Sequence, residues 1–274
     1  VDVFTKSSSH KFERISFVRF ARIAPSPFRG RKIIPGRLQQ PARRKGNIKQ
    51  KVKYTRMSYN KLKALEGNIE AISTALAIHE ERRNATTAER ETLSKFTGCG
   101  GIKEVLSIGT GTPIPDTMQE AVKRLLSVLS KAAKGNETLY RQLLQSLKSS
   151  VLTAFYTPTF LIQAVAKQIK DTFTANDLKM GTFLEPSAGI GGFLPVGDMA
   201  THRTAFEKDL LTGLVLSALH PDTQVFIEGF ETIDSQETEH NRFDVIASNI
   251  PFGDFRVFDN TFSKKGGIYA QASK

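Results

Sequence analysis

Two short apolar runs, each followed directly by a turn of unusual composition, constrain the fold of this chain most strongly. The run at residues 182–184 leads into a turn rich in glycine, residues 185–193. The run at residues 243–247 leads into a second turn, residues 249–252. Short apolar runs bounded by such turns are typical of buried parallel strands, and ligands bind beyond the carboxyl ends of such strands. We therefore expect both turns to meet at one edge of a parallel sheet.

The pattern around these runs predicts an α/β fold with a partial parallel sheet. Strands are expected near 181–185, 203–207, 224–228 and 243–248. Helices are expected between them, near 192–200 and 209–219. Alternation of this kind is typical of parallel sheets.

A helical region is expected in front of this sheet, over residues 57–150. One helix, from about Ser58 to Arg83, has an apolar stripe at a spacing of three and four residues, formed by Leu62, Leu65, Ile69, Ile72 and Leu76. Further helices are predicted near 117–133 and 137–150. Another helix should begin at Thr157, a natural N-cap, with Pro158 in its first position. The glycine-rich segment 96–116 lacks the Gly-Lys-Ser/Thr ending of a nucleotide-binding P-loop.

Residues 1–56 are predicted to form a basic, disordered arm. The segment holds 16 Lys and Arg against Asp2 and Glu13, whereas the whole chain has a net charge of +12. It also has several Pro and Gly and no sustained period. Such an arm would attract nucleic-acid phosphates in a salt-sensitive way. A solvated leader without a specific partner explains the same composition, and a transit peptide is a less favoured reading.

Composition excludes several classes of protein. Cys99 is the only cysteine, so neither an intrachain disulfide nor a thiolate zinc cluster can form. The five histidines are scattered, and no metal site is expected. No apolar run approaches the ~18 residues of a membrane span, so a soluble intracellular protein is expected.

The first turn has the composition of a site for the amino-acid end of a cofactor. Gly189, Gly191 and Gly192 permit positive φ and close backbone approach. Glu185 would repel a pyrophosphate but suits a cationic amino group. The dinucleotide fingerprint also fails, because its third glycine is Leu194 here. A strand-to-helix turn without a ligand is the alternative.

Two residues on the following strands could complete this site. Glu207 ends the next predicted strand, 18 residues after Gly189, where a carboxylate can accept hydrogen bonds from ribose hydroxyls. A surface glutamate is the alternative. Phe230, after the third strand, could lie against an adenine ring or pack in the core.

The second turn suits a planar ring that carries an amino group. The side-chain oxygen of Asn249 and the carbonyl of Ile250 could both accept from that amine and favour a nucleophilic geometry at its nitrogen. Pro251 would stiffen the turn, and Phe252 would offer a flat face to a flipped base. An ordinary Asn-x-Pro turn with a core phenylalanine is the alternative.

Residues 150–260 resemble the amino-group (N6-adenine) DNA methyltransferases, in particular methylase modules of bacterial mobile elements and phages. The resemblance rests on residues 150–158, on the motif from Glu185 through Pro186, Gly189 and Gly191 to Gly192, and on residues 249–252. It implies a Rossmann-like methyltransferase core over 151–274 that binds S-adenosylmethionine and DNA, in a cytoplasmic protein of bacterial or phage origin.

The resemblance also implies roles for individual residues. Tyr156, Thr157 and Glu185 would contact S-adenosylmethionine, and Glu207 would bind its ribose. The target adenine would be held by Asn249, Ile250 and Phe252, and the methyl group would pass directly, without a covalent enzyme intermediate.

The chain departs from this family at two positions and in length. Ile250 replaces the first proline of the family motif, and Gly229 stands where many members have Asp. The family normally continues with three more strands, so we expect a fragment, or a chain that needs a further chain or domain to be active. Methylation of RNA guanine or of protein glutamine, and a non-catalytic DNA-binding module, remain alternatives. Cytosine C5 methylation needs a nucleophilic cysteine, and Cys99 lies far from the motif.

Overall fold

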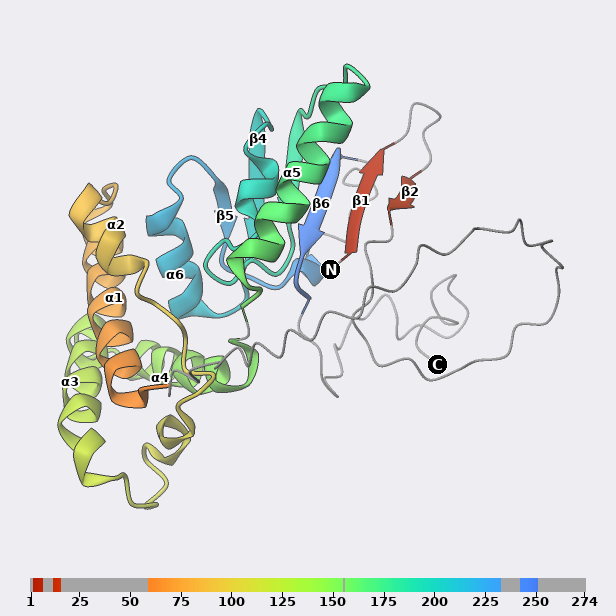
Figure 1. Ribbon diagram of the computed structural model, residues 1–274. Coiled ribbons are helices and arrows are strands. Elements are labelled where there is room, and N and C mark those ends of the chain that lie inside the picture. Colours follow the sequence, from red (N-terminus) through yellow and green to blue (C-terminus); the bar gives the residue numbers. More distant parts are fainter. Residues whose placement is uncertain (1, 7–11, 16–58, 155, 233–241, 251–274) are drawn as a thin grey trace, which may run out of the picture. The chain divides into compact units, whose positions relative to one another are not determined.

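The computed structural model describes residues 2–6, 12–15, 59–154, 156–232 and 242–250 (Figure 1). The α-helices are α1 (Lys61–Glu81), α2 (Thr87–Leu93), α3 (Asp116–Ala133), α4 (Glu137–Thr153), α5 (Thr159–Ala175) and α6 (Leu210–Leu219). The strands are β1 (Asp2–Lys6), β2 (Phe12–Ile15), β3 (Thr182–Glu185), β4 (His202–Phe206), β5 (Gln224–Phe226) and β6 (Val245–Ser248). Short 3₁₀ helices are η1 (Lys103–Ser107), η2 (Leu194–Gly197) and η3 (Phe230–Thr232).

The apolar stripe predicted on the first long helix enters a shared hydrophobic core. Leu65, Ile69 and Ile72 of α1 are at most 3% exposed. Leu214 and Val215 of α6 belong to the same buried cluster, together with residues of α3 and α4. The helical region therefore shares its core with a helix of the α/β part, so that the two parts stabilise each other.

The strands form one sheet in the order β2-β1-β6-β3-β4-β5. Strands β6, β3, β4 and β5 run parallel to one another, which confirms the predicted α/β class with a small parallel sheet. Strand β1 pairs antiparallel with both β6 and β2.

The central strand β3 is buried on both faces. Phe183 packs with Ile169 and Phe173 of α5, which lies across this face of the sheet (Figure 1). Leu184 points to the opposite face, where it packs with Phe206 of β4. Phe183 and Leu184 are both 0% exposed, as expected for a parallel strand covered on each side.

The structure differs from the predicted disordered arm over 1–56 at two segments, because it contains β1 and β2. Without β1, the outer edge of β6 would present unpaired N–H and C=O groups. The β1 register, from Asp2 opposite Ser248 to Thr5 opposite Val245, pairs that edge. The rest of the predicted arm lies outside the described residues.

Two local predictions are wrong. The helix expected near 192–200 is replaced by turns and η2, because Pro195 starts the short helix and Gly197 lies so close to β3 that a Cβ would overlap the Phe183 ring. Thr157 does not cap α5. The N-cap is Pro158 in an extended conformation, without a side-chain hydrogen bond, and the helix begins at Thr159.

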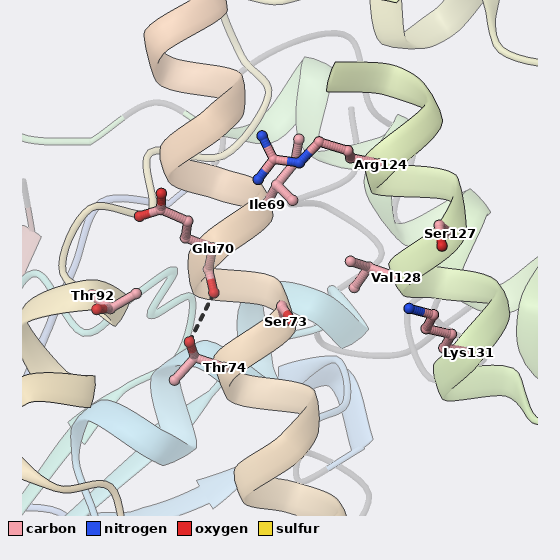
Figure 2. A pocket seen from close by; sticks show the side chains of 9 residues that line it. All are labelled: Ile69, Glu70, Ser73, Thr74, Thr92, Arg124, Ser127, Val128 and Lys131. Atoms are coloured by element: carbon pink, nitrogen blue, oxygen red, sulfur yellow. Dashed lines mark hydrogen bonds between the residues drawn. The ribbon is translucent and has the colours of Figure 1, made fainter. Parts of the chain in front are cut away.

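A hollow of about 540 Å³ lies between α1, α2 and α3 (Figure 2). It is lined by Ile69, Glu70, Ser73, Thr74, Thr92, Arg124, Ser127, Val128 and Lys131. None of the residues predicted to form the site lines it. In the described part of the chain, no helix is long and apolar enough to cross a membrane.

Two glycines inside helices, Gly213 of α6 and Gly67 of α1, provide a matched test of how tightly α6 packs on Ile227. A Cβ added at Gly213 of α6 would lie 2.7 Å from Cγ2 of Ile227, whereas one added at Gly67 of α1 would have its nearest neighbour at 3.5 Å. We expect Gly213→Ala to lower the free energy of unfolding by about 1–3 kcal/mol through overpacking. Gly67→Ala should raise it by about 0.5–1 kcal/mol through helix propensity. Urea unfolding measures both, and equal stability of the two variants would contradict the packing of α6 on Ile227.

Candidate active site

The two turns singled out by the sequence lie at the same edge of the sheet. Strands β3 and β6 are parallel neighbours, with Leu184 opposite Ile246, so their carboxyl ends lie side by side. The hydroxyl of Ser248, the last residue of β6, donates to the carbonyl of Ser187 at 3.3 Å. The glycine turn and the start of the Asn249 turn are therefore in direct contact, as the sequence predicted.

Glu207 holds the glycine turn to the start of α6. Its Oε2 accepts from the N–H of Gly189 at 2.7 Å, and its Oε1 accepts from the N–H of Asp209 at 2.8 Å. Burial raises the pKa of Glu207 to about 7, although these backbone hydrogen bonds favour its ionised form. The 18-residue spacing thus brings Gly189 and Glu207 together, and both carboxylate oxygens have backbone partners.

Glu185 is a buried carboxyl group with one oxygen unpartnered. It is 1% exposed, and its Oε1 accepts from the N–H of Phe193 at 3.0 Å. Its Oε2 has no hydrogen-bond partner among the described residues. Burial, with a smaller contribution from the charge of Glu207, raises the pKa of Glu185 well above its ordinary value. The site can therefore hold either a proton or a cationic group at this oxygen.

Tyr156 covers the glycine turn. A Cβ added at Gly189 would lie 2.8 Å from Cε1 of Tyr156, so the ring lies directly against the glycine. The residue is nevertheless 40% exposed. Burial of the hydroxyl, followed by the charges of Glu207 and Asp209, raises its pKa. Thr157 follows it, partly buried. Three residues far apart in sequence, Tyr156, Gly189 and Glu207, thus share one site.

The helical region supports Tyr156 through the glycine-rich loop that contains Gly98 and Gly100. Asn68, 0% exposed on α1, donates to the carbonyl of Gly98 and accepts from the N–H of Thr97, both at 2.8 Å. A Cβ at Gly98 would lie 2.5 Å from the Cβ of Ala154, and one at Gly100 would lie 2.5 Å from the carbonyl oxygen of Ala154. The loop glycines therefore allow a close approach to the residues just before Tyr156.

His220 is a second residue that sequence reasoning missed. Its Nε2 lies 3.1 Å from the carbonyl oxygen of Ile190, and a Cβ at Gly191 would lie 2.7 Å from the same Nε2. Gly189 and Gly191 have the predicted positive φ, 58° and 86°. However, Tyr156 and His220 fill the space beside them. Close side-chain packing is therefore a sufficient reason for both glycines.

The structure describes some of the remaining predicted site residues and not others. Phe230 packs edge-on against Phe206, with ring centroids 5.5 Å apart, so the core-packing alternative is observed. Pro186 and Asn249 are partly buried, and Ile250, two residues after the end of β6, is 60% exposed. The predictions for residues 251–252 lie outside the described residues. Among the residues that are described, no group of three or more His, Cys, Asp or Glu could hold a metal ion.

The raised pKa of Glu185 predicts a pH-dependent stability. A carboxyl group with a raised pKa binds more protons in the folded state than in the unfolded state, so stability is lost as the pH rises above about 4.5. Glu185→Gln removes this loss. We expect the variant to gain stability over the wild type by up to about 1.4 kcal/mol per pH unit, until the pH reaches the folded-state pKa.

Urea unfolding between pH 5 and pH 8 measures this difference, in which the contribution of His220 cancels and the coupling between Glu185 and Glu207 is included. The control is Glu104→Gln. Hydrogen bonding to Lys61 lowers the pKa of Glu104, so above about pH 4.5 its replacement should lower the stability by an amount that does not change with pH, and its curve should run parallel to that of the wild type. A Glu185→Gln curve parallel to that of the wild type would contradict a buried, proton-binding Glu185.

Comparisons with known proteins give one partial similarity. The protein "Defense against restriction protein B" of Escherichia phage P1 is 31% identical over 102 residues. The match covers 37% of this chain and 4% of the phage protein, so the chain spans a small part of the length of this relative. No family model matches the chain. No solved structure matches it either.

Proposed function

We propose that this chain is part of the catalytic core of an S-adenosylmethionine-dependent methyltransferase that modifies the exocyclic N6 of adenine in DNA. The order of the parallel strands supports a Rossmann-like core. If the parallel strands β3, β4, β5 and β6 are renumbered 1 to 4 in chain order, their spatial order across the sheet is 3-2-1-4. This is the beginning of the doubly wound order, in which ligands bind at the switch point between strands 1 and 4. The glycine turn and the Asn249 turn lie at that point.

The residues around the glycine turn fit the cofactor in chemical character. The unpartnered, buried Oε2 of Glu185 would accept from the cationic amino group. Glu207 would accept from ribose hydroxyls with the lone pairs that its two backbone donors leave free. Tyr156, Thr157 and the turn from Pro186 to Gly191 would line the amino-acid end.

The residues after β6 would prepare the target amine. The side-chain oxygen of Asn249 and the carbonyl of Ile250 would each accept an amino hydrogen and so localise the nitrogen lone pair. When bound, the cofactor would supply a methyl group to the amine nitrogen, its sulfonium sulfur would keep the electron pair of the broken C–S bond, and the methylated amine would lose one proton to water. Pro251 and Phe252 would stiffen the turn and stack on the base.

The environment of Cys99 supports transfer to nitrogen rather than to cytosine C5. The C5 reaction needs a reactive thiolate. Cys99 is 1% exposed in the helical core, and burial raises its pKa to about 11. This thiol is therefore protonated at neutral pH and inaccessible to a base.

The similarity to the phage P1 protein supports DNA as the acceptor. The printed name of that protein describes defence against restriction. Restriction enzymes cut unmodified DNA, and methylation of a base in their site prevents the cut. A methylase that acts on DNA agrees with that name better than one that acts on RNA guanine or protein glutamine.

One observation favours a non-catalytic DNA-binding module instead. Tyr156, His220 and Leu194 fill the space beside Gly189 and Gly191, so these glycines are explained without a ligand. The unpartnered oxygen of Glu185 remains unexplained by this alternative, and it is the observation on which our proposal depends most.

Calorimetry with S-adenosylmethionine tests the cofactor site directly. We expect binding, and we expect Glu207→Ala to weaken it at least tenfold, equivalent to about 1.4 kcal/mol. At pH 6.5, below the pKa of Glu207, a cationic ligand should release protons from Glu185 and Glu207, so the observed enthalpy should vary with the ionisation enthalpy of the buffer. Glu120→Ala on α3 is the control and should bind like the wild type. Absence of heat in the wild type, together with salt-dependent DNA binding, would favour the non-catalytic module.

Methyl transfer from labelled S-adenosylmethionine tests the acceptor. DNA, RNA and other proteins are offered as acceptors. We expect this chain, together with any further domain that it needs, to label DNA at adenine N6. Asn249→Ala should lower the rate at least a hundredfold and change the cofactor Kd little, because the amide acts on the amine and not on the cofactor. Asn176→Ala, at the end of α5, is the control. Undiminished labelling by Asn249→Ala would remove the assignment of this residue.

A further inference from the structure

The C-terminal end of α6 is fastened to the glycine turn by His220. The residue is the C-cap of α6, and its Nε2 lies 3.1 Å from the carbonyl oxygen of Ile190. A carbonyl can only accept, so Nε2 carries the hydrogen, and in the neutral ring Nδ1 does not. The hydrogen bond therefore fixes the tautomer of His220.

The imidazole also sets the backbone conformation of the turn. Gly191 has φ 86°, and a Cβ there would lie 2.7 Å from Nε2 and 2.9 Å from Cδ2 of His220. The ring thus lies flush against the backbone at a position that only glycine adopts readily. Its contacts span two consecutive residues of the turn, Ile190 and Gly191.

The opposite end of α6 holds the same turn. Glu207, two residues before the N-cap Asp209, accepts from the N–H of Gly189. The consecutive residues Gly189 and Ile190 are therefore bound from both ends of one helix, one through an N–H and the other through a carbonyl. This arrangement fixes the orientation of the peptide groups between them.

We propose that His220 is a positioning residue, which holds the glycine turn in the conformation that S-adenosylmethionine requires. The inference rests on the proposed cofactor. The residue lies outside the turn, and its hydrogen bond and ring packing would support binding there.

The surroundings of His220 disfavour its charged form. Burial, with a smaller contribution from the positive charge of Arg203, lowers its pKa, whereas the hydrogen bond to Ile190 and the charges of Asp222 and Asp198 act in the opposite direction. Arg203 of β4 donates to both aspartates, which lie in the turns after α6 and after η2, so much of their charge is already paired. At neutral pH the imidazole is therefore neutral. Protonation adds a hydrogen at Nδ1 and leaves Nε2–H donating to Ile190, so the stability lost as the pH falls through the lowered pKa reflects burial of the charge and not loss of this hydrogen bond.

Backbone NMR of the cofactor-free protein tests the hold on the turn. The amide signals of Gly191 and Gly192 should titrate with a midpoint below pH 6.5 in the wild type and in His202→Gln, a control at the exposed start of β4. They should lose this titration in His220→Gln, which keeps an N–H donor but cannot ionise in this range. Unchanged titration in His220→Gln would overturn the proposal.

Affinity measurements test the consequence for the cofactor. At pH 7.5, His220→Ala should bind S-adenosylmethionine about tenfold more weakly than the wild type, and His220→Gln should restore most of the loss. Wild-type affinity in His220→Ala would overturn the proposal. If the wild type binds no S-adenosylmethionine at any pH, the proposed function fails, and the NMR titration still decides whether His220 holds the turn.

Discussion

The carboxylate of Glu207 is the single group on which the geometry of the candidate site depends. It follows β4 directly, and its two oxygens accept from the glycine turn after β3 and from Asp209 at the start of α6. Asp209 in turn accepts from the hydroxyl of Ser146 on α4 at 2.8 Å. One partly buried acid thus connects the sheet, the turn and the helical region. The fold retains it although burial raises its pKa to about 7, which means that the ionised form is costly in this position.

The helical region is more than a packing partner of the sheet. Asn68 is fully buried, and its amide is bonded on both sides to the loop that contains Gly98. An amide in that position would be costly if either side lacked a partner, so it specifies one conformation of the loop. Close approach of the loop to Ala154 then fixes where Tyr156 begins to cover Gly189. Residues some 90 positions before the glycine turn therefore help to shape it.

The parts of the structure that follow from local pattern could be predicted from the sequence. The stripe on α1, the parallel strands and the meeting of Gly189 with Glu207 rest on periodicity and on the rule that parallel strands end at a common edge. The missed residues depend on contacts across long sequence distances. Nothing near His220 indicates that its ring meets Ile190, 30 positions earlier. The glycines were predicted with the right backbone conformation, and the side chains that fill the space beside them could not be foreseen. Strands β1 and β2 were missed because the basic composition around them resembles that of a disordered arm.

The contrast between Glu104, which is partly buried, and Glu185, which is buried, shows why Glu185 is the stronger indication of a ligand. Both Glu104 and Glu185 have an Oε2 without a hydrogen-bond partner among the described residues. Glu104 is paired with Lys61 at 2.6 Å, which lowers its pKa, so its charge is compensated within the chain. In the described structure no cation pairs with Glu185, and the charge of a second acid, Glu207, raises its pKa further. A proton can neutralise Glu185, and under the proposed function the cationic amino group of the cofactor would take the place of that proton and relieve the repulsion between the two acids.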